Sequence, residues 1–256
     1  MLRDRAPDHR GILLDPLAFL SGYPSPYGGG PRTFPMVAYK ESQTQRTADL
    51  ILEDTGRAAG PVTLTFTGEP ALIWRQRSLA SDDVELHHVL EHDVRDLLPT
   101  GADVTLDSID NLQDYEKPLV AHFTVKAQVA TVTARRAIVP GQLFQVNEQP
   151  LFPDEKRESA VYFHYPERVA DGVRFHMPPS WQIKSPPAEN AFKFKDMAFY
   201  KSHSQLSGTT ITLHRDYVLA SVIAFPKEYA QLREFYSKVA VHDQEPLVVE
   251  LGTAAP

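Results

Sequence analysis

Apolar and polar residues alternate along short segments of this chain, and glycine and proline separate the segments. Residues 47–54 (TADLILED) and 61–80 (PVTLTFTGEPALIWRQRSLA) are rich in Thr, Val, Ile and aromatic residues with partial period-two alternation, which predicts strands. Similar strand-like stretches return at residues 102–109, 118–127 and 129–139. We therefore expect a β-sheet in the first half of the chain.

One amphipathic helix is expected among these strands, at residues 82–98. Ser81 is a suitable N-cap, and Asp82 and Asp83 place negative charge in the first turn. Pro99 ends the pattern. The apolar positions follow helical spacing and predict one buried face, made of Leu86, Leu90, Val94, Leu97 and Leu98.

The second half shows a different arrangement of the same signals. Residues 140–158 contain three prolines and a run of charged residues, which indicates a domain boundary. Beyond them, turn residues recur at short intervals between strand-like segments, a pattern typical of a small antiparallel sandwich. A helix is expected at residues 227–243, and its predicted apolar face consists of Tyr229, Leu232, Phe235, Tyr236 and Val239.

Together these patterns predict a mainly β protein of the α+β class with two β-sheet or β-sandwich domains. Residues 31–140 would form a sheet that carries one main helix, and residues 150–256 a small antiparallel β-sandwich with a C-terminal helix. Residues 1–30 end in a Gly- and Pro-rich stretch and are expected to lie outside both domains.

Composition narrows the classes of function. The 256 residues carry a net charge of −7 without a basic stripe, so nucleic acid is not an expected partner. No apolar run approaches the roughly 18 residues of a membrane span. Asp15 and Pro16 interrupt the apolar residues near the N-terminus, so no secretory signal is expected. The sequence contains no cysteine, which excludes thiolate nucleophiles and cysteine-ligated metals, and we expect no cofactor.

One short motif resembles a metal site. His88, Glu91 and His92 have the H-x-x-E-H spacing of inverted zinc metallopeptidases. On a helical wheel, however, both histidines lie opposite the apolar face, where we expect solvent and not a buried cleft. Glu167, 75 residues after His92, could be nominated as a third ligand, but it lies across the predicted boundary. The zinc peptidase is therefore a remote alternative, and His88 and His92 are weak metal candidates.

Aromatic residues after the boundary offer a second type of site. Tyr162, Phe163, Tyr165, Phe175 and Trp181 could form a platform on which a sugar stacks. Most such residues belong to hydrophobic cores, and the alternation in VYFHYP allows only one of its two faces to meet solvent. Trp181 and Tyr165, which we expect to be half-buried, are the remaining binding candidates.

Three stretches resemble the C-terminal part of a bacterial transglutaminase-like family. VYFHYPERVADGVRFHMPPSWQIKSPP is similar to its strand pair with a Pro-Pro-x-Trp turn, and FPKEYAQLREFYSKVAVHDQEPLVVEL to its terminal helix and last strand. NLQDYEKPLVAHFTV is similar to the acidic turn and strand before the boundary. The family combines an N-terminal β-rich domain, a papain-like catalytic core and C-terminal β-rich domains of unknown function.

The resemblance covers roughly residues 11 to 256 and implies specific roles. GILLDPLAF resembles the tail of the catalytic core, which would make residues 1–30 a remnant of that core and its linker, and Asp15 a relic of the carboxylate that orients the catalytic histidine. No His-x-Trp segment precedes Asp15, and the nucleophilic cysteine is absent. Such chemistry needs a thiolate, an imidazole and a carboxylate together.

The resemblance therefore implies a non-catalytic accessory or interaction region. Its partner would be a transglutaminase-like catalytic domain or another protein, in a periplasmic or extracellular setting. A free-standing ligand-binding β-sandwich module, for example for glycans, is the alternative.

Overall fold

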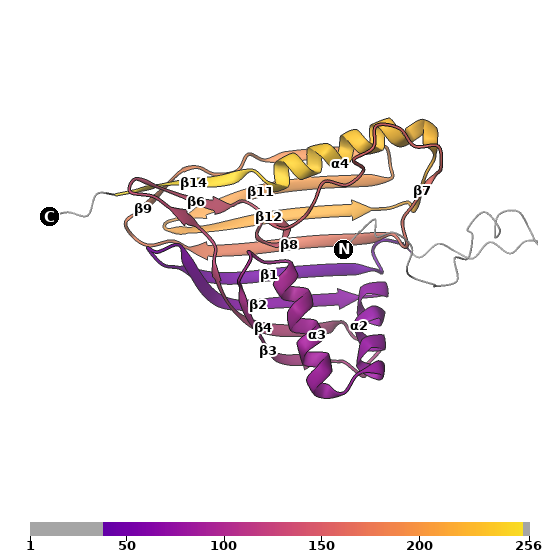
Figure 1. Cartoon of the computed structure of the whole chain (residues 1–256), viewed down its shortest axis with the longest axis horizontal. Coiled ribbons are helices and arrows are strands. Elements are labelled where there is room, and N and C mark those ends of the chain that lie inside the picture. The colour runs from indigo at the N-terminus through magenta and orange to yellow at the C-terminus, as the bar shows by residue number, and fades with distance from the viewer. Residues whose placement is uncertain (1–37, 253–256) are drawn as a thin grey trace, which may run out of the picture. The chain divides into compact units, whose positions relative to one another are not determined.

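The computed structural model describes residues 38–252, which belong to one compact unit. Its centre is a mixed sheet of eight strands in the order β10-β11-β12-β8-β1-β2-β4-β3 (Figure 1). The predicted mainly β fold class is confirmed. In sheet order, the strands are β10 (Asn190–Phe194), β11 (Ala198–Ser207), β12 (Thr210–Leu219), β8 (Glu167–His176), β1 (Gln43–Leu52), β2 (Arg57–Thr67), β4 (Leu119–Gln128) and β3 (Asp103–Asp110).

Two smaller sheets accompany the large one. The four-stranded sheet has the order β5-β6-β14-β9, and the two-stranded sheet pairs β13 with β7. Apolar side chains of the four-stranded sheet, such as Val139 and Val249, share one hydrophobic core with Val173 and Phe175 of the large sheet. The strands are β5 (Thr131–Val132), β6 (Arg136–Pro140), β14 (Pro246–Leu251), β9 (Trp181–Ser185), β13 (Ile223–Ala224) and β7 (Val161–Tyr162).

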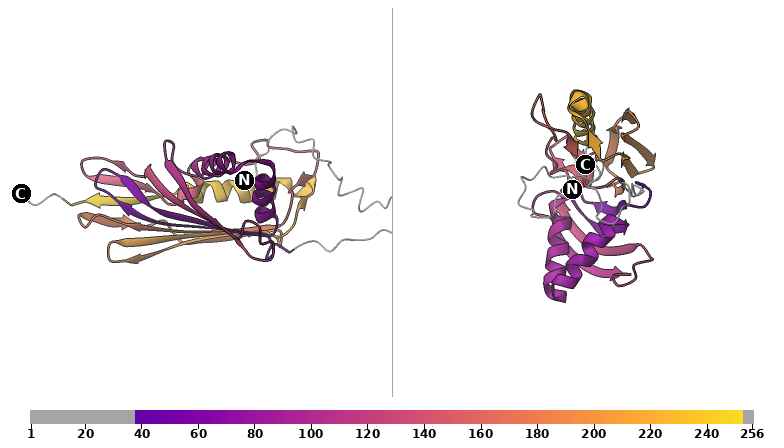
Figure 2. Two further views of the ribbon diagram at one scale, coloured as in Figure 1. Left: turned by 90° about the horizontal axis from the view of Figure 1, so that it is seen from below. Right: turned by 90° about the vertical axis from the view of Figure 1, so that its right-hand side faces the viewer.

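The helices cover one face of the large sheet. They are α2 (Glu69–Ala80), α3 (Asp83–Asp96) and α4 (Tyr229–Asp243), with short 3-10 helices η1 (Leu143–Gln145) and η2 (Pro226–Glu228). Figure 2 shows α3 and α4 on the same side of the strands. Along β12, every second residue is buried, as expected for a sheet with one covered face. We call the covered face the inner face and the opposite one the outer face.

Helix α3 confirms the predicted amphipathic helix. Leu86, Leu90 and Val94 are buried in the core below it. The cap differs by one residue, because the side chain of Asp82, and not that of Ser81, accepts the backbone N–H of Glu85 at 2.8 Å. Helix α4 likewise buries the whole apolar face that its spacing predicts.

The predicted strand at residues 61–80 is wrong beyond Thr67, because residues 69–80 form α2. Gly68 has φ 60°, and a Cβ there would clash with the carbonyl oxygen of Glu41, so only glycine permits this turn out of β2. Trp74 then packs on Phe66, with ring centroids 4.6 Å apart. Tertiary packing of this aromatic residue therefore overrides its preference for strands.

The structure also differs from the prediction of two separate domains. Strands from both sides of residues 140–158 share the large sheet, because β1 pairs with β8 in parallel. The proline-rich segment itself is packed: Leu143 and Phe144 are buried, and Phe152 contacts the rings of Tyr229 and Tyr236. Its apolar side chains fix it to the core despite a linker-like composition. In residues 38–252, no helix has the length and apolar character that a membrane crossing requires.

The packing of α3 gives a direct test of the helix assignment. Leu90 is fully buried, so Leu90→Asp would place an unpaired charge in the core and cost several kcal/mol of unfolding free energy, on the order of half the stability of a domain. His88→Asp, on the exposed side of the same helix, should change stability by no more than about 0.5 kcal/mol. Urea unfolding followed by circular dichroism measures both; equal effects of the two variants would contradict the packing.

Candidate functional site

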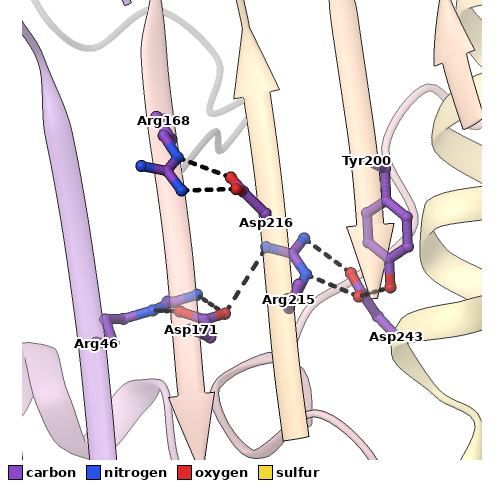
Figure 3. Close-up of polar contacts among 7 residues, drawn as sticks. All are labelled: Arg46, Arg168, Asp171, Tyr200, Arg215, Asp216 and Asp243. Carbon is purple, nitrogen blue, oxygen red and sulfur yellow. Dashed lines mark hydrogen bonds and ion pairs between the residues drawn. The ribbon is translucent and has the colours of Figure 1, made fainter. Parts of the chain in front are cut away.

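A row of charged side chains crosses the inner face at the centre of the large sheet (Figure 3). In the strand register, Arg46 of β1 lies opposite Asp171 of β8, and Asp171 lies opposite Arg215 of β12. Asp243, at the end of α4, extends the row from the helix. Positive and negative groups therefore alternate along a line that joins three strands and one helix.

Short charge-assisted hydrogen bonds connect the members of this row. Arg46 donates to both carboxylate oxygens of Asp171, at 2.6 and 2.7 Å. Arg215 donates to both oxygens of Asp243, at 2.8 and 2.9 Å, and its Nη1 lies 3.8 Å from Oδ2 of Asp171. The hydroxyl of Tyr200 donates to Asp243 at 2.8 Å. Such two-pronged contacts fix both the distance and the orientation of the guanidinium groups.

The row is buried and electrically balanced. Two guanidinium groups face two carboxylates, and all four residues are almost entirely shielded from solvent. Burial disfavours the charged form of Arg215, but the neighbouring carboxylate of Asp243 outweighs it and raises the pKa of this guanidinium. Aromatic rings complete the surroundings, since the guanidinium of Arg46 lies 5.1 Å from the ring centroid of Phe144.

Further titratable groups lie on the same inner face. The hydroxyl groups of Tyr217 and Tyr236 are 2.5 Å apart, and burial raises the pKa of both phenols. Burial also raises the pKa of the Glu167 carboxyl, which Arg46 and Arg215 oppose by favouring the charged form. Several charged and phenolic groups are thus held together away from water.

This arrangement is suited to holding elements together. Within the described residues, no buried side-chain nitrogen or oxygen lacks a hydrogen-bond partner. Each carboxylate of the row accepts hydrogen bonds from guanidinium or phenol donors. These hydrogen bonds connect β1, β8, β11, β12 and α4 to one another. Breaking such a buried pair is costly, because the remaining charge would stay in a medium of low dielectric constant.

A comparable ion pair on the outer face provides an internal reference. Arg168 of β8 donates to both oxygens of Asp216 of β12, at 2.9 and 2.7 Å (Figure 3). Both side chains are partly exposed, so water screens this pair. The Arg46–Asp171 and Arg168–Asp216 pairs therefore have similar geometry and very different burial.

The residues of the H-x-x-E-H motif are not brought together as a metal site. The side chains of His88 and His92 are 76% and 67% exposed. Glu91 instead accepts the backbone N–H of Leu106 at 3.0 Å, where the pairing of β3 with β4 shifts its register. Glu91 thus attaches α3 to the edge strand. Residues 38–252 contain no group of three His, Asp or Glu side chains arranged to hold a metal ion.

Among residues 38–252, the other site residues predicted from the sequence do not come together in one place. Trp181 is buried in the core and cannot form an exposed stacking platform. Tyr165 is half-buried, and burial together with Glu167 raises the pKa of its phenol. Glu167 lies in β8 on the inner face and not beside His88 or His92 on α3. Asp15 lies outside the described residues.

The charge row was not predicted from the sequence. One signal was present: in TITLHRDYVL, Arg215 occupies an inward position between Leu213 and Tyr217. A charged residue in the apolar register of a strand indicates a buried partner. The identity of the partner was not accessible, because Asp171 and Asp243 come from distant segments of the chain.

Comparison with known proteins gave two partial matches. Residues 135–249 match a family model described as a domain of unknown function with a solved structure (DUF3858). A crystal structure described as a "putative protease" from Parabacteroides distasonis ATCC 8503 is similar with 15% identity and a TM-score of 0.41. That match covers 47% of this chain and spans 24% of the length of the other. The comparison with curated proteins gave no match.

The Arg46–Asp171 and Arg168–Asp216 pairs allow a matched test of the charge row. Asp171→Asn should cost about 3–5 kcal/mol of unfolding free energy, because it leaves the buried Arg46 without its carboxylate. Asp216→Asn makes the same chemical change on the outer face and should cost no more than about 1 kcal/mol. Chemical denaturation of both variants measures the difference. Equal losses would show that burial does not govern these pairs.

The raised pKa of Glu167 predicts a pH dependence. A carboxyl group with a higher pKa in the folded than in the unfolded state stabilises the fold below its ordinary pKa of 4.5. This contribution is lost as the pH rises through the folded-state value. Glu167→Gln stays neutral, so the stability of the variant relative to wild type should increase between acidic and neutral pH. Urea unfolding across this range tests it, with exposed Glu148→Gln as control; a constant difference would contradict the assignment.

Proposed function

We propose that this chain is a non-catalytic accessory region of a transglutaminase-like protein, and that it binds the catalytic domain of that protein. The observation that carries the proposal is the exposure of large apolar side chains where α2 meets α3. Leu79 in the last turn of α2 is 71% exposed, and Val84 in the first turn of α3 is 69% exposed. We call this region the helical corner.

The helical corner has the character of a contact surface. Helix α2 buries Ala71 and Trp74 against the sheet, yet Leu72 and Leu79 on its other sides also meet solvent. A helix that only covers a sheet carries polar residues on its outer side. Neighbouring exposed apolar side chains instead favour a protein partner that removes them from water.

The non-catalytic part of the proposal rests on chemistry. Acyl transfer of the transglutaminase type needs a cysteine thiolate, and the sequence has no cysteine. The buried charge row supplies no substitute, since its carboxylates are engaged by Arg46, Arg215 and Tyr200. Its contacts favour a role in holding the sheet and α4 in place.

The identity of the partner rests on the resemblance of the sequence. The stretches at residues 161–187 and 225–251 resemble C-terminal domains that accompany a papain-like core in the transglutaminase-like family. The family model that matches residues 135–249 describes a domain of unknown function and names no activity. A periplasmic or extracellular setting belongs to the same proposal.

Titration with a separately expressed papain-like core tests the proposal. Calorimetry should detect association, and Leu79→Asp with Val84→Asp should weaken it at least about tenfold, because a charge at a buried contact loses more than about 1.4 kcal/mol of binding free energy. Val241→Asp is the matched control, since Val241 lies on α4 and is 67% exposed. Absence of association at high micromolar concentration would contradict the accessory role.

A further inference from the structure

We propose that the outer face of the large sheet carries a binding site for a divalent transition-metal ion, formed by His203 of β11 and His214 of β12. The two residues lie directly opposite each other in the antiparallel register. Their imidazole rings are nearly parallel, with an interplanar angle of 14° and centroids 4.6 Å apart. The inference is independent of the proposed accessory function.

The surroundings of these two rings differ from those of the other outer-face histidines. His122 contacts Thr63 and Asp110 through its two ring nitrogens, and His176 contacts Thr210 and Asp49. By contrast, His203 and His214 have no hydrogen-bonding partner among residues 38–252 and contact each other.

Their ring nitrogens are therefore available as ligands, while the other two histidines are held by neighbouring side chains. The hydrogen-bonded histidines stabilise the sheet. In the stacked pair, the ring nitrogens have no hydrogen bonds to described residues to lose when they bind a metal ion.

The residue beside the pair in the next strand is a glycine. Gly172 of β8 is the register neighbour of His214, and a Cβ at that position would still lie 3.9 Å from Nδ1 of His214. The next residue in the row is Thr47 of β1, whose methyl carbon would be 3.8 Å from the same Cβ. Gly172 therefore places no side chain of its own against the imidazole of His214.

Imidazole nitrogen selects the chemical class of the ion. Neutral imidazole binds zinc and copper at about 2.0–2.1 Å, so two nitrogens about 3.4 Å apart span a tetrahedral metal ion. The stacked rings hold their nitrogen lone pairs in nearly parallel planes, so binding one ion requires both imidazoles to rotate about their terminal side-chain bonds until two nitrogens converge. Within the described residues no third His, Asp or Glu completes the set, so the remaining positions fall to water or an external ligand.

The charges around the pair do not oppose such an ion. The neighbouring outer-face charges occur in pairs that neutralise each other: Arg168 with Asp216, Arg174 with Asp49, and Lys201 with Glu189. Burial lowers the pKa of His214, and the neighbouring His203 lowers it further.

Titration of the metal-free full chain tests the site. Calorimetry with zinc chloride should show binding at one ion per chain, and copper(II) bound to the chain should show coupling to two imidazole nitrogens in its electron paramagnetic resonance spectrum. His203→Ala and His214→Ala should each weaken binding at least about tenfold, because even residues that only orient a metal ligand change affinity 10–100-fold.

Two controls make the outcome decisive. The variant with His88→Ala and His92→Ala removes the exposed pair on α3 and should leave the affinity unchanged. Gly172→His adds a third imidazole to the row and should tighten zinc binding at least about tenfold, since a third ligand replaces water. Zinc binding that survives His203→Ala with His214→Ala, or that disappears with the α3 pair, would overturn the proposal.

Discussion

The parallel pairing of β1 with β8 holds the two halves of the described chain in one sheet. On one side of this pair lie β2, β4 and β3 with helices α2 and α3, and on the other lie β12, β11 and β10 with α4. The bond between Arg46 and Asp171 crosses the joint on the inner face. A shift of one residue along β1 would turn Arg46 to the outer face and leave Asp171 buried without its partner. We therefore expect the buried charges to specify the register more than they add net stability.

Much of the fold follows from patterns within single segments. The helical spacing of Leu232, Phe235, Tyr236 and Val239 predicts both α4 and the side it buries, and most strands follow from period-two alternation. Helix α2 could not be predicted from its local pattern, because its aromatic and branched residues favour strands when considered alone. Its helical state depends on the turn at Gly68 and on packing that only the folded chain supplies.

The candidate site was less predictable than the fold, for a related reason. The four members of the charge row come from positions 46, 171, 215 and 243, and no local spacing connects them. The motif that did have a suggestive spacing, His88-x-x-Glu91-His92, lies on the exposed side of α3. Spacing along a helix shows which side chains share a face. The groups that contact this face depend on the rest of the fold. Here the carboxylate of Glu91 accepts a hydrogen bond from the backbone of β3.

The pairing of β1 with β8 also has a consequence for folding during synthesis. Arg46 and Asp171 are separated by 125 positions, so the β1–β2 hairpin leaves the ribosome long before the strand that β1 must pair with. Contacts between such distant segments close late and slow the folding of a domain. Until β8 is available, the edge of β1 that pairs with it would lack a partner strand, and unpaired strand edges favour aggregation. The positive charge of Arg46 would repel the same strand of another incomplete chain. The residue that fixes the register in the folded protein would then also disfavour association between incomplete chains.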